Sequence, residues 1–156
     1  MTKATKIRNY VTPQNTFPVT KSNDIKNELT ISFKYLDTNN SKYSMDSIND
    51  NRKRNKLEKD LKSKLKEYCS YNDFKKKMTS DINFKENNHI HPIDWNDKQI
   101  REKCFTNVEN NLMEEIKYEC WQLGIDNQGF RAHGFFIENV FYIVWLDPNH
   151  QLYLRK

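Results

Sequence analysis

The amino-acid sequence predicts an α+β fold, in which a helical hairpin packs on a twisted, mainly antiparallel sheet formed largely by the C-terminal half. Three observations lead to this prediction. Apolar and polar residues alternate over 29–35, which is typical of a half-buried strand. Leucine and tyrosine residues recur at helical spacing over 57–68. Residues 130–137 and 140–146 are rich in the aromatic and β-branched side chains that strands favour.

The composition predicts one domain with a polar surface. The 156 residues suit a single domain, and we expect residues 28–156 to form it. Residues 1–27 contain two prolines, many polar residues and no period, so we expect an extended or flexible N-terminal arm. Hydrophobic residues make up only 36%, but aromatic residues make up 13%, and their large side chains can build a core from few positions.

Three features predict a cytoplasmic protein with no membrane segment. No run of the sequence approaches the roughly 20 apolar residues that a membrane helix needs. The basic first residues lead into no apolar stretch of the kind found in a secretory signal. Cys69, Cys104 and Cys120 are odd in number and lack CxxC spacing, which favours reduced thiols over a disulfide framework.

The first half predicts one strand and two helices. The alternation places Leu29, Ile31, Phe33 and Tyr35 on one face of the strand 29–35. No Gly or Pro interrupts residues 45–69, so we expect a long helix there.

Capping residues mark where these helices start. Ser44 or Ser47 is the candidate cap of the long helix. Residues 71–81 predict a short second helix capped by Asn72, with a polar loop after it.

The second half predicts most of the sheet. Residues 89–95 form a short extended segment, and 96–116 contain one or two short helices with Asn96 and Asn107 as candidate caps. Residues 117–125 predict a strand that ends in a turn.

The last two strands are predicted to form a hairpin that turns at 138–139. Reflection about that turn places Arg131 opposite Leu146 and His133 opposite Val144. A slip by one residue would move the side chains to the other face.

Polar residues of this hairpin are candidates for a catalytic site. Arg131 and His133 are two apart on one strand and share a face, while Asp147, His150 and Tyr153 lie at and after the end of the next strand. We expect Arg131, Asp147 and His150 to converge at one edge of the sheet, with Tyr153 nearby. Arginine stabilises a pentavalent phosphate, histidine moves a proton near neutral pH, and tyrosine donates or orients. These residue types suit metal-independent RNA cleavage.

Structural roles remain open for the same residues. Asp147 can simply cap backbone amides of its turn, and Arg131 can pair with Asp147 or Glu138. His150 can likewise be a structural turn residue. His133, beside a glycine, can be a satisfied sheet histidine, and Tyr153 can be a packing residue.

Charge is distributed unevenly along the chain. Residues 1–88 contain 19 Lys/Arg and 11 Asp/Glu, whereas residues 89–156 contain 7 and 10. The stretch 52–66 of the long helix carries eight basic and two acidic side chains. A basic face of this kind predicts a polyanion such as RNA as partner, although a solvated lysine-rich helix explains it equally well. The candidate RNA-binding residues are Arg52, Lys53, Arg54, Lys56 and Lys59.

Motifs for a metal or a cofactor are absent from the sequence. There is no HExxH, CxxC or glycine-rich phosphate loop. His89 and His91 would share a face on a strand, so a metal-dependent nuclease that uses them is an alternative. We expect no cofactor.

The C-terminal hairpin resembles the RelE/YoeB/YafQ superfamily of toxin ribonucleases. The resemblance lies in an arginine near the start of the penultimate strand, a hydrophobic strand after a tight turn, and a histidine and an aromatic residue near the end. It implies a small basic α+β protein that cleaves mRNA, usually on the ribosome, without metal, and is inhibited by an antitoxin. By position it implies Arg131 as the phosphate-binding residue, His150 as acid or base and Tyr153 as the terminal aromatic, with His91 and His133 as further candidates.

This chain departs from those toxins in length. It is about half again as long, and residues 80–117 have no counterpart. The segments "FKYLD", "HPIDW" and "RAHGFF…FYIVWLDPNHQLY" also look like a bacterial family of small uncharacterised proteins.

The sequence therefore predicts a metal-independent endoribonuclease of toxin or phage-defence type, acting on RNA or ribosomes by general acid/base chemistry. The alternative is a non-catalytic RNA- or protein-binding component of a bacterial or phage conflict system. An antitoxin or another protein is an expected partner in either case.

Overall fold

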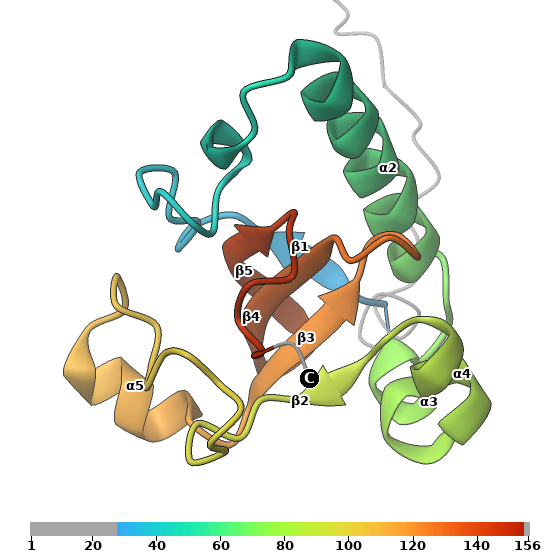
Figure 1. Cartoon of the computed structure of the whole chain (residues 1–156). Helices are drawn as coiled ribbons and strands as arrows, with labels where there is room; N and C mark the ends of the chain where they lie inside the picture. Colours follow the sequence, from blue (N-terminus) through green and yellow to red (C-terminus); the bar gives the residue numbers. More distant parts are fainter. Residues whose placement is uncertain (1–27, 155–156) are drawn as a thin grey trace, which may run out of the picture.

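The computed structural model describes residues 28–154, so the arm expected at 1–27 lies outside the described part (Figure 1). Five strands form one sheet in the order β1-β5-β4-β3-β2. β1 is parallel to β5, and the other three pairings are antiparallel. The predicted α+β fold with its mainly antiparallel sheet is confirmed. The strands are β1 (Thr30–Ser32), β2 (His91–Pro92), β3 (Cys120–Gly124), β4 (Arg131–Ile137) and β5 (Val140–Asp147).

Both faces of the sheet are covered. Three helices, α2 (Asn51–Cys69), α3 (Phe74–Ser80) and α4 (Ile82–Asn87), pack with Leu123, Ile143 and their neighbours in one apolar core. A second core contains α5 (Asn110–Ile116), the segment before it and the buried Trp145. The sequence prediction packed the helices on one face of the sheet, so the position of α5 on this second face was not predicted. No helix among residues 28–154 combines the length and the apolar character needed to cross a membrane.

The start of α2 differs from the prediction because an aspartate caps it. α2 starts after Asp50, whose carboxylate accepts the amides of Arg52 and Lys53 at 2.8 and 3.1 Å, so neither predicted serine caps it. Ser44 instead precedes a short 3-10 helix, Met45–Ser47.

The later helices also begin at unpredicted residues. α3 starts after Asp73 rather than Asn72, and α5 starts after Glu109 rather than Asn107. The predicted polar loop after α3 is in fact α4, because Asp81 Oδ1 accepts the amide of Phe84 at 2.9 Å and the Phe84 ring is buried.

β1 is shorter than the predicted strand. The alternation holds for Leu29 and Ile31, but the chain then turns, with the amide of Leu36 donating to the carbonyl of Phe33 at 3.0 Å. The Phe33 side chain is consequently 51% exposed, while Tyr35 packs against the second core.

A β-bulge changes the register of the C-terminal hairpin. The turn at 138–139 is as predicted, and simple reflection holds from Gly134 to Ile137. Between His133 and Gly134, however, β5 contributes the extra residue Val144. Arg131 therefore pairs with Asp147 and not with Leu146, and His133 pairs with Trp145 and not with Val144. The bulge brings Asp147 onto the face that carries Arg131 and His133.

The bulge requires a glycine at position 134, and Gly134→Ala should be destabilising. An added Cβ would lie 2.1 Å from the carbonyl oxygen of Tyr142, so backbone atoms would have to move. We expect a loss of about 3 kcal/mol in the free energy of unfolding, measured by urea denaturation. Gln128→Ala, at an exposed turn position, is the control and should change it by less than about 0.5 kcal/mol. Equal stability of Gly134→Ala and the wild type would contradict the close approach.

Candidate functional site

Polar side chains form a row across one face of the sheet. His91 on β2 lies opposite Gln122 on β3, and Gln122 lies opposite His133 on β4. One pair further along, Arg131 lies opposite Asp147. Directly opposed residues, and residues two apart on a strand, share a face. The hydrophobic sheet thus carries five polar side chains together.

Asp147 joins β4 to the segment that follows β5. Its side chain is fully buried, and Oδ2 lies 3.2 Å from Nε2 of His133. The same carboxylate accepts the amides of Gln151 at 2.7 Å and Leu152 at 2.9 Å. Burial acts to raise the pKa of Asp147, but the hydrogen bond and charge of His133, with the two amides, outweigh it and lower the pKa. Asp147 is therefore an ionised anchor that holds the loop carrying His150.

Arg131 is a buried cation without an ion pair among residues 28–154. Its side chain is 5% exposed, and Nη1 donates to the carbonyls of Asp126 at 2.8 Å and Phe130 at 2.9 Å. Its Nε has no hydrogen-bond partner among the described residues. Burial lowers the pKa of Arg131, although a guanidinium stays charged in proteins. Because buried charges are normally paired, this arrangement favours an anionic ligand.

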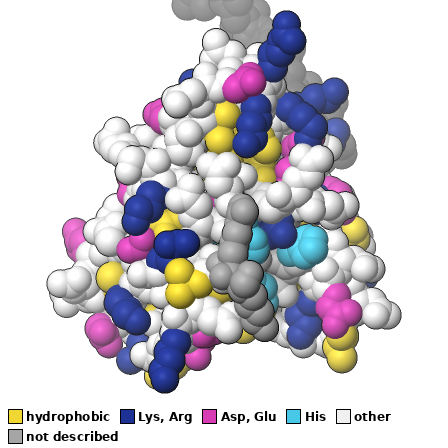
Figure 2. Space-filling view, viewed as in Figure 1, with side chains coloured by type: hydrophobic (Ala, Val, Ile, Leu, Met, Phe, Trp, Pro, Cys, Tyr) yellow, Lys and Arg dark blue, Asp and Glu magenta, His cyan; other side chains and the backbone are white. Residues whose placement is uncertain are grey.

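Arg131 and three histidines line one pocket of about 520 Å³. Figure 2 shows histidine side chains gathered on one face of the molecule, beneath the lower end of α2, with Lys/Arg atoms beside them. The remaining walls come from α4, β2 and β3. The lining residues are Ile82, Lys85, Glu86, His89, Ile90, His91, Pro92, Gln122, Arg131 and His150.

The hydrogen bonds of His91 indicate which ring nitrogen is basic. Its Nδ1 lies 3.0 Å from the carbonyl oxygen of Pro92, which can only accept, so Nδ1 carries the proton in that contact. Nε2 then keeps its lone pair. The hydroxyl of Tyr153 lies 3.4 Å from the same Nδ1, and the two rings pack edge to face with centroids 5.2 Å apart. The Tyr153 ring also lies 6.0 Å from that of His150.

His89 and His150 both adopt left-handed backbone conformations, with φ of 51° and 53°. Non-glycine residues rarely adopt such angles, and these angles are concentrated at functional sites. Burial, followed by the charge of Arg131, lowers the pKa of both histidines. Burial also lowers the pKa of His91. For His150, the Asp147 carboxylate partly opposes this shift. The pocket therefore contains histidines that release protons more readily than usual.

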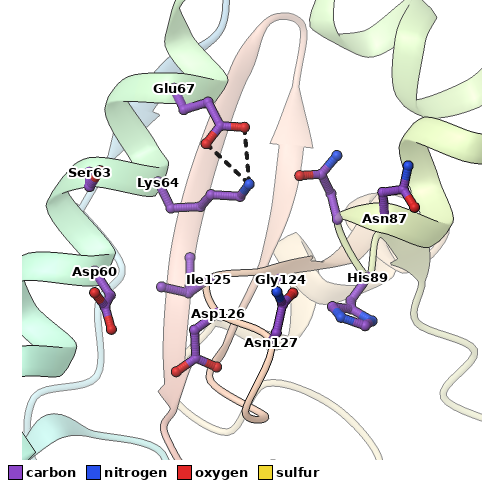
Figure 3. A pocket seen from close by; sticks show the side chains of 11 residues that line it. Asp60, Ser63, Lys64, Glu67, Asn87, His89, Gly124, Ile125, Asp126 and Asn127 are labelled. Atoms are coloured by element: carbon purple, nitrogen blue, oxygen red, sulfur yellow. Dashed lines mark hydrogen bonds and ion pairs between the residues drawn. The ribbon is translucent and has the colours of Figure 1, made fainter.

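A second, polar hollow of about 270 Å³ adjoins this pocket and shares His89 with it. In Figure 3, Asp60, Lys64 and Glu67 on α2 face the β3–β4 turn across the hollow, and Lys64 Nζ contacts both carboxylate oxygens of Glu67 at 3.0 and 3.2 Å. Gly124 and Asn88 both line this hollow, and their backbones approach closely. A Cβ at position 124 would lie 2.2 Å from the carbonyl oxygen of Asn88.

The predicted catalytic residues come together in the structure. Arg131, His91 and His150 line the pocket, while Tyr153 contacts the rings of both these histidines. His133 is completely buried and does not line the pocket. It is linked to the pocket residues by its position opposite Gln122 and by its contact with Asp147. Asp147 does cap its turn, and it does not pair with Arg131. The structural interpretation of Asp147 therefore holds alongside its link to His133.

The predicted RNA-binding residues lie elsewhere, on the N-terminal half of α2. Arg52, Lys53 and Lys59 are exposed. Arg54 is half-buried and donates to the carbonyl of Ile48 at 3.2 and 2.6 Å, and Lys56 pairs with Asp60 at 2.9 Å. Two of these five side chains therefore have structural partners.

The metal alternative rested on His89 and His91 sharing a strand face. His89 lies outside β2 with a left-handed backbone, although both histidines line the same pocket. Within residues 28–154, no three or more His, Cys, Asp or Glu side chains are grouped so that they could hold one metal ion.

Sequence reasoning missed Gln122 and the contribution of α4. Gln122 is 1% exposed, its Nε2 donates to the carbonyl of His89 at 3.1 Å, and its Oε1 has no partner among the described residues. A lone amide side chain inside the buried strand "CWQLG" was the available signal. The α4 residues were missed because that segment was predicted to be a loop.

A protein-family model described as "Uncharacterised protein UU032" matches residues 31–156. This chain belongs to that family. The matched residues include all those that line the Arg131 pocket. No curated protein and no solved structure matches the chain. The resemblance of the UU032 chain to the RelE, YoeB and YafQ toxins therefore stays a prediction.

Replacing the Asp147 anchor should cost stability in a pH-dependent way. We expect Asp147→Asn to lower the free energy of unfolding by about 3 kcal/mol at neutral pH, since His133 loses its buried partner. The folded-state pKa lies below the ordinary value of 3.8, so the folded chain holds fewer protons than the unfolded chain near that pH. The stabilisation is complete above about pH 5 and disappears as the pH falls through the folded-state pKa.

Urea denaturation of wild type and Asp147→Asn from about pH 3 to 7 measures this difference. The exposed Asp46→Asn serves as control and should show little difference at any pH. A difference for Asp147→Asn that stays constant down to pH 3 would contradict an ionised anchor.

Proposed function

We propose that this protein is a metal-independent endoribonuclease that cleaves RNA by general acid/base chemistry. The observation that carries the proposal is Arg131, a buried guanidinium without an ion pair in the described part, in one pocket with His89, His91 and His150. A phosphodiester would supply the missing negative charge, and the histidines would move its protons.

The cleavage step assigns one proton transfer to each of two histidines. His91 Nε2 removes the proton from a ribose 2′-hydroxyl, and the 2′-oxygen attacks the adjacent phosphorus. The bond from phosphorus to the 5′-oxygen then breaks, and protonated His150 donates a proton to that oxygen. The products are a 2′,3′-cyclic phosphate and a free 5′-hydroxyl.

The surroundings of each histidine support its role. The Pro92 carbonyl holds the proton of His91 on Nδ1 and leaves Nε2 free to act as base. Burial and Arg131 lower the pKa of His150, and the charge of Asp147 partly opposes that shift, so His150 acts as an acid on the acidic side of its ordinary range. Arg131 would stabilise the charge that develops on the phosphate. Tyr153 packs against both rings and would keep them oriented.

The biological setting and partners rest on the resemblance to toxin ribonucleases. We propose RNA, free or on the ribosome, as the substrate, and an inhibitory antitoxin or other protein partner. The exposed Arg52, Lys53 and Lys59 of α2 would attract the RNA backbone.

Purified protein should cleave RNA in the presence of EDTA. His150→Asn should lower the rate by at least about 100-fold, because the general acid is removed. Asparagine tolerates the left-handed backbone at this position, so the fold should be retained. Gel analysis of labelled RNA, with the exposed Gln128→Ala as control, measures the effect.

Four outcomes would count against a metal-independent ribonuclease. Intact RNA after incubation with wild type would contradict it, as would equal cleavage by His150→Asn. Cleavage that EDTA abolishes would favour the metal-dependent alternative. Binding without cleavage would favour the non-catalytic RNA-binding alternative.

The pH dependence of cleavage should peak on the acidic side of pH 6.5. The base must be unprotonated and the acid protonated, and the pKa values of His91 and His150 both lie below the ordinary 6.5. The rate should therefore fall as His150 loses its proton toward higher pH. Measurement of kcat/KM from about pH 4 to 8 tests this expectation. A maximum above pH 8 would exclude this histidine pair.

A further inference from the structure

A third hollow, of about 580 Å³, lies next to the Arg131 pocket at β2. Pro92 lines both of them. Figure 1 shows α4 and α5 on opposite sides of β2, and each contributes to one of the two hollows. A ligand bound at Arg131 could therefore extend over β2 toward α5.

The third hollow offers aromatic rings and balanced charge. Tyr118, after α5, is 82% exposed, and Trp95, which is 9% exposed, forms part of the wall. Lys117 Nζ lies 5.1 Å from the centroid of the Tyr118 ring and 3.4 Å from a carboxylate oxygen of Glu114. The lining carries as many acidic as basic side chains, namely Asp94, Glu114, Lys103 and Lys117.

This lining suits an uncharged planar group better than a phosphate. A phosphate would gain little binding free energy here, because the acidic and basic side chains are equal in number. A nucleobase, in contrast, would stack on an exposed ring. Bases can do so only when they are unpaired, because a duplex hides their faces. A single RNA strand would thus place a phosphate at Arg131 and a neighbouring base beyond Pro92.

We propose that the hollow beside α5 is a nucleobase subsite, with Tyr118 as the stacking platform, and that the ligand is single-stranded RNA. The inference rests on the proposed function, since it takes the Arg131 pocket as the phosphate site. Tyr118 contributes its ring to binding and takes no part in proton transfer. Its exposure means that substitutions should leave the fold intact.

The test measures binding without cleavage, by fluorescence anisotropy of labelled single-stranded RNA about six nucleotides long. The protein carries His150→Asn so that the RNA is not cut. Tyr118→Ala should weaken binding about 10-fold, and Tyr118→Phe should bind like the parent because the ring is retained. Phe33→Ala is the matched control, an exposed aromatic residue beside β1 at the opposite edge of the sheet, and should have no effect.

Abasic oligonucleotides sharpen the test. If a base stacks on Tyr118, removal of that base should weaken binding to the parent, and Tyr118→Ala should then cause no further loss. One abasic position along the oligonucleotide should show this coupling. A duplex of the same sequence should bind without any dependence on Tyr118.

The outcomes separate this inference from the proposed function. Cleavage in EDTA together with unchanged binding by Tyr118→Ala overturns the subsite and leaves the ribonuclease standing. Ring-dependent binding by a protein that never cuts RNA supports the subsite and overturns the ribonuclease. Equal loss in Tyr118→Ala and Phe33→Ala, or loss with no abasic coupling, overturns the stacking role.

Discussion

The one-residue bulge in the C-terminal hairpin decides which side chains share a face. Without Val144 as an extra residue, Leu146 would oppose Arg131, and Asp147 would point to the other side of the sheet. With the bulge, Asp147 reaches His133 and the amides of the following loop. That loop carries His150 into the pocket. The one-residue change in register therefore lets Asp147, on the sheet, hold the loop that places His150 in the pocket.

The same sheet buries a charge that its own residues do not neutralise. Arg131 is held by carbonyl oxygens, while the carboxylate opposite it is occupied by His133 and two amides. Burying this guanidinium at 5% exposure, with no ion pair within residues 28–154, costs free energy. Oε1 of Gln122, which has no hydrogen-bond partner in the described part of the chain, carries a similar cost in the same pocket. The left-handed backbones of His89 and His150 add local strain at the same pocket, while Asp73 and Glu138 adopt such angles away from it.

Periodicity predicted the elements better than it predicted their ends. The leucine spacing of α2 and the turn at 138–139 depend on local patterns, and both are confirmed. The start of α2 was wrong because Asp50 competes with two serines, and sequence alone does not rank the three caps. α4 was missed because six residues carry too little periodicity to distinguish a helix from a loop. The cover over the second face depends on contacts between distant segments, which periodicity does not contain.

The sequence by itself determined the α+β class, the hairpin and the residue types gathered at its ends, because strand alternation, helical spacing and turn chemistry act over a few neighbouring residues. Only the tertiary structure decided that His91, from a segment about 40 residues earlier, lies in one pocket with Arg131 and His150. It also decided that Arg131 has no carboxylate partner within residues 28–154. The first fact arises from the order of strands in the sheet, and the second arises because His133 and two loop amides occupy Asp147. Both depend on packing across the whole domain.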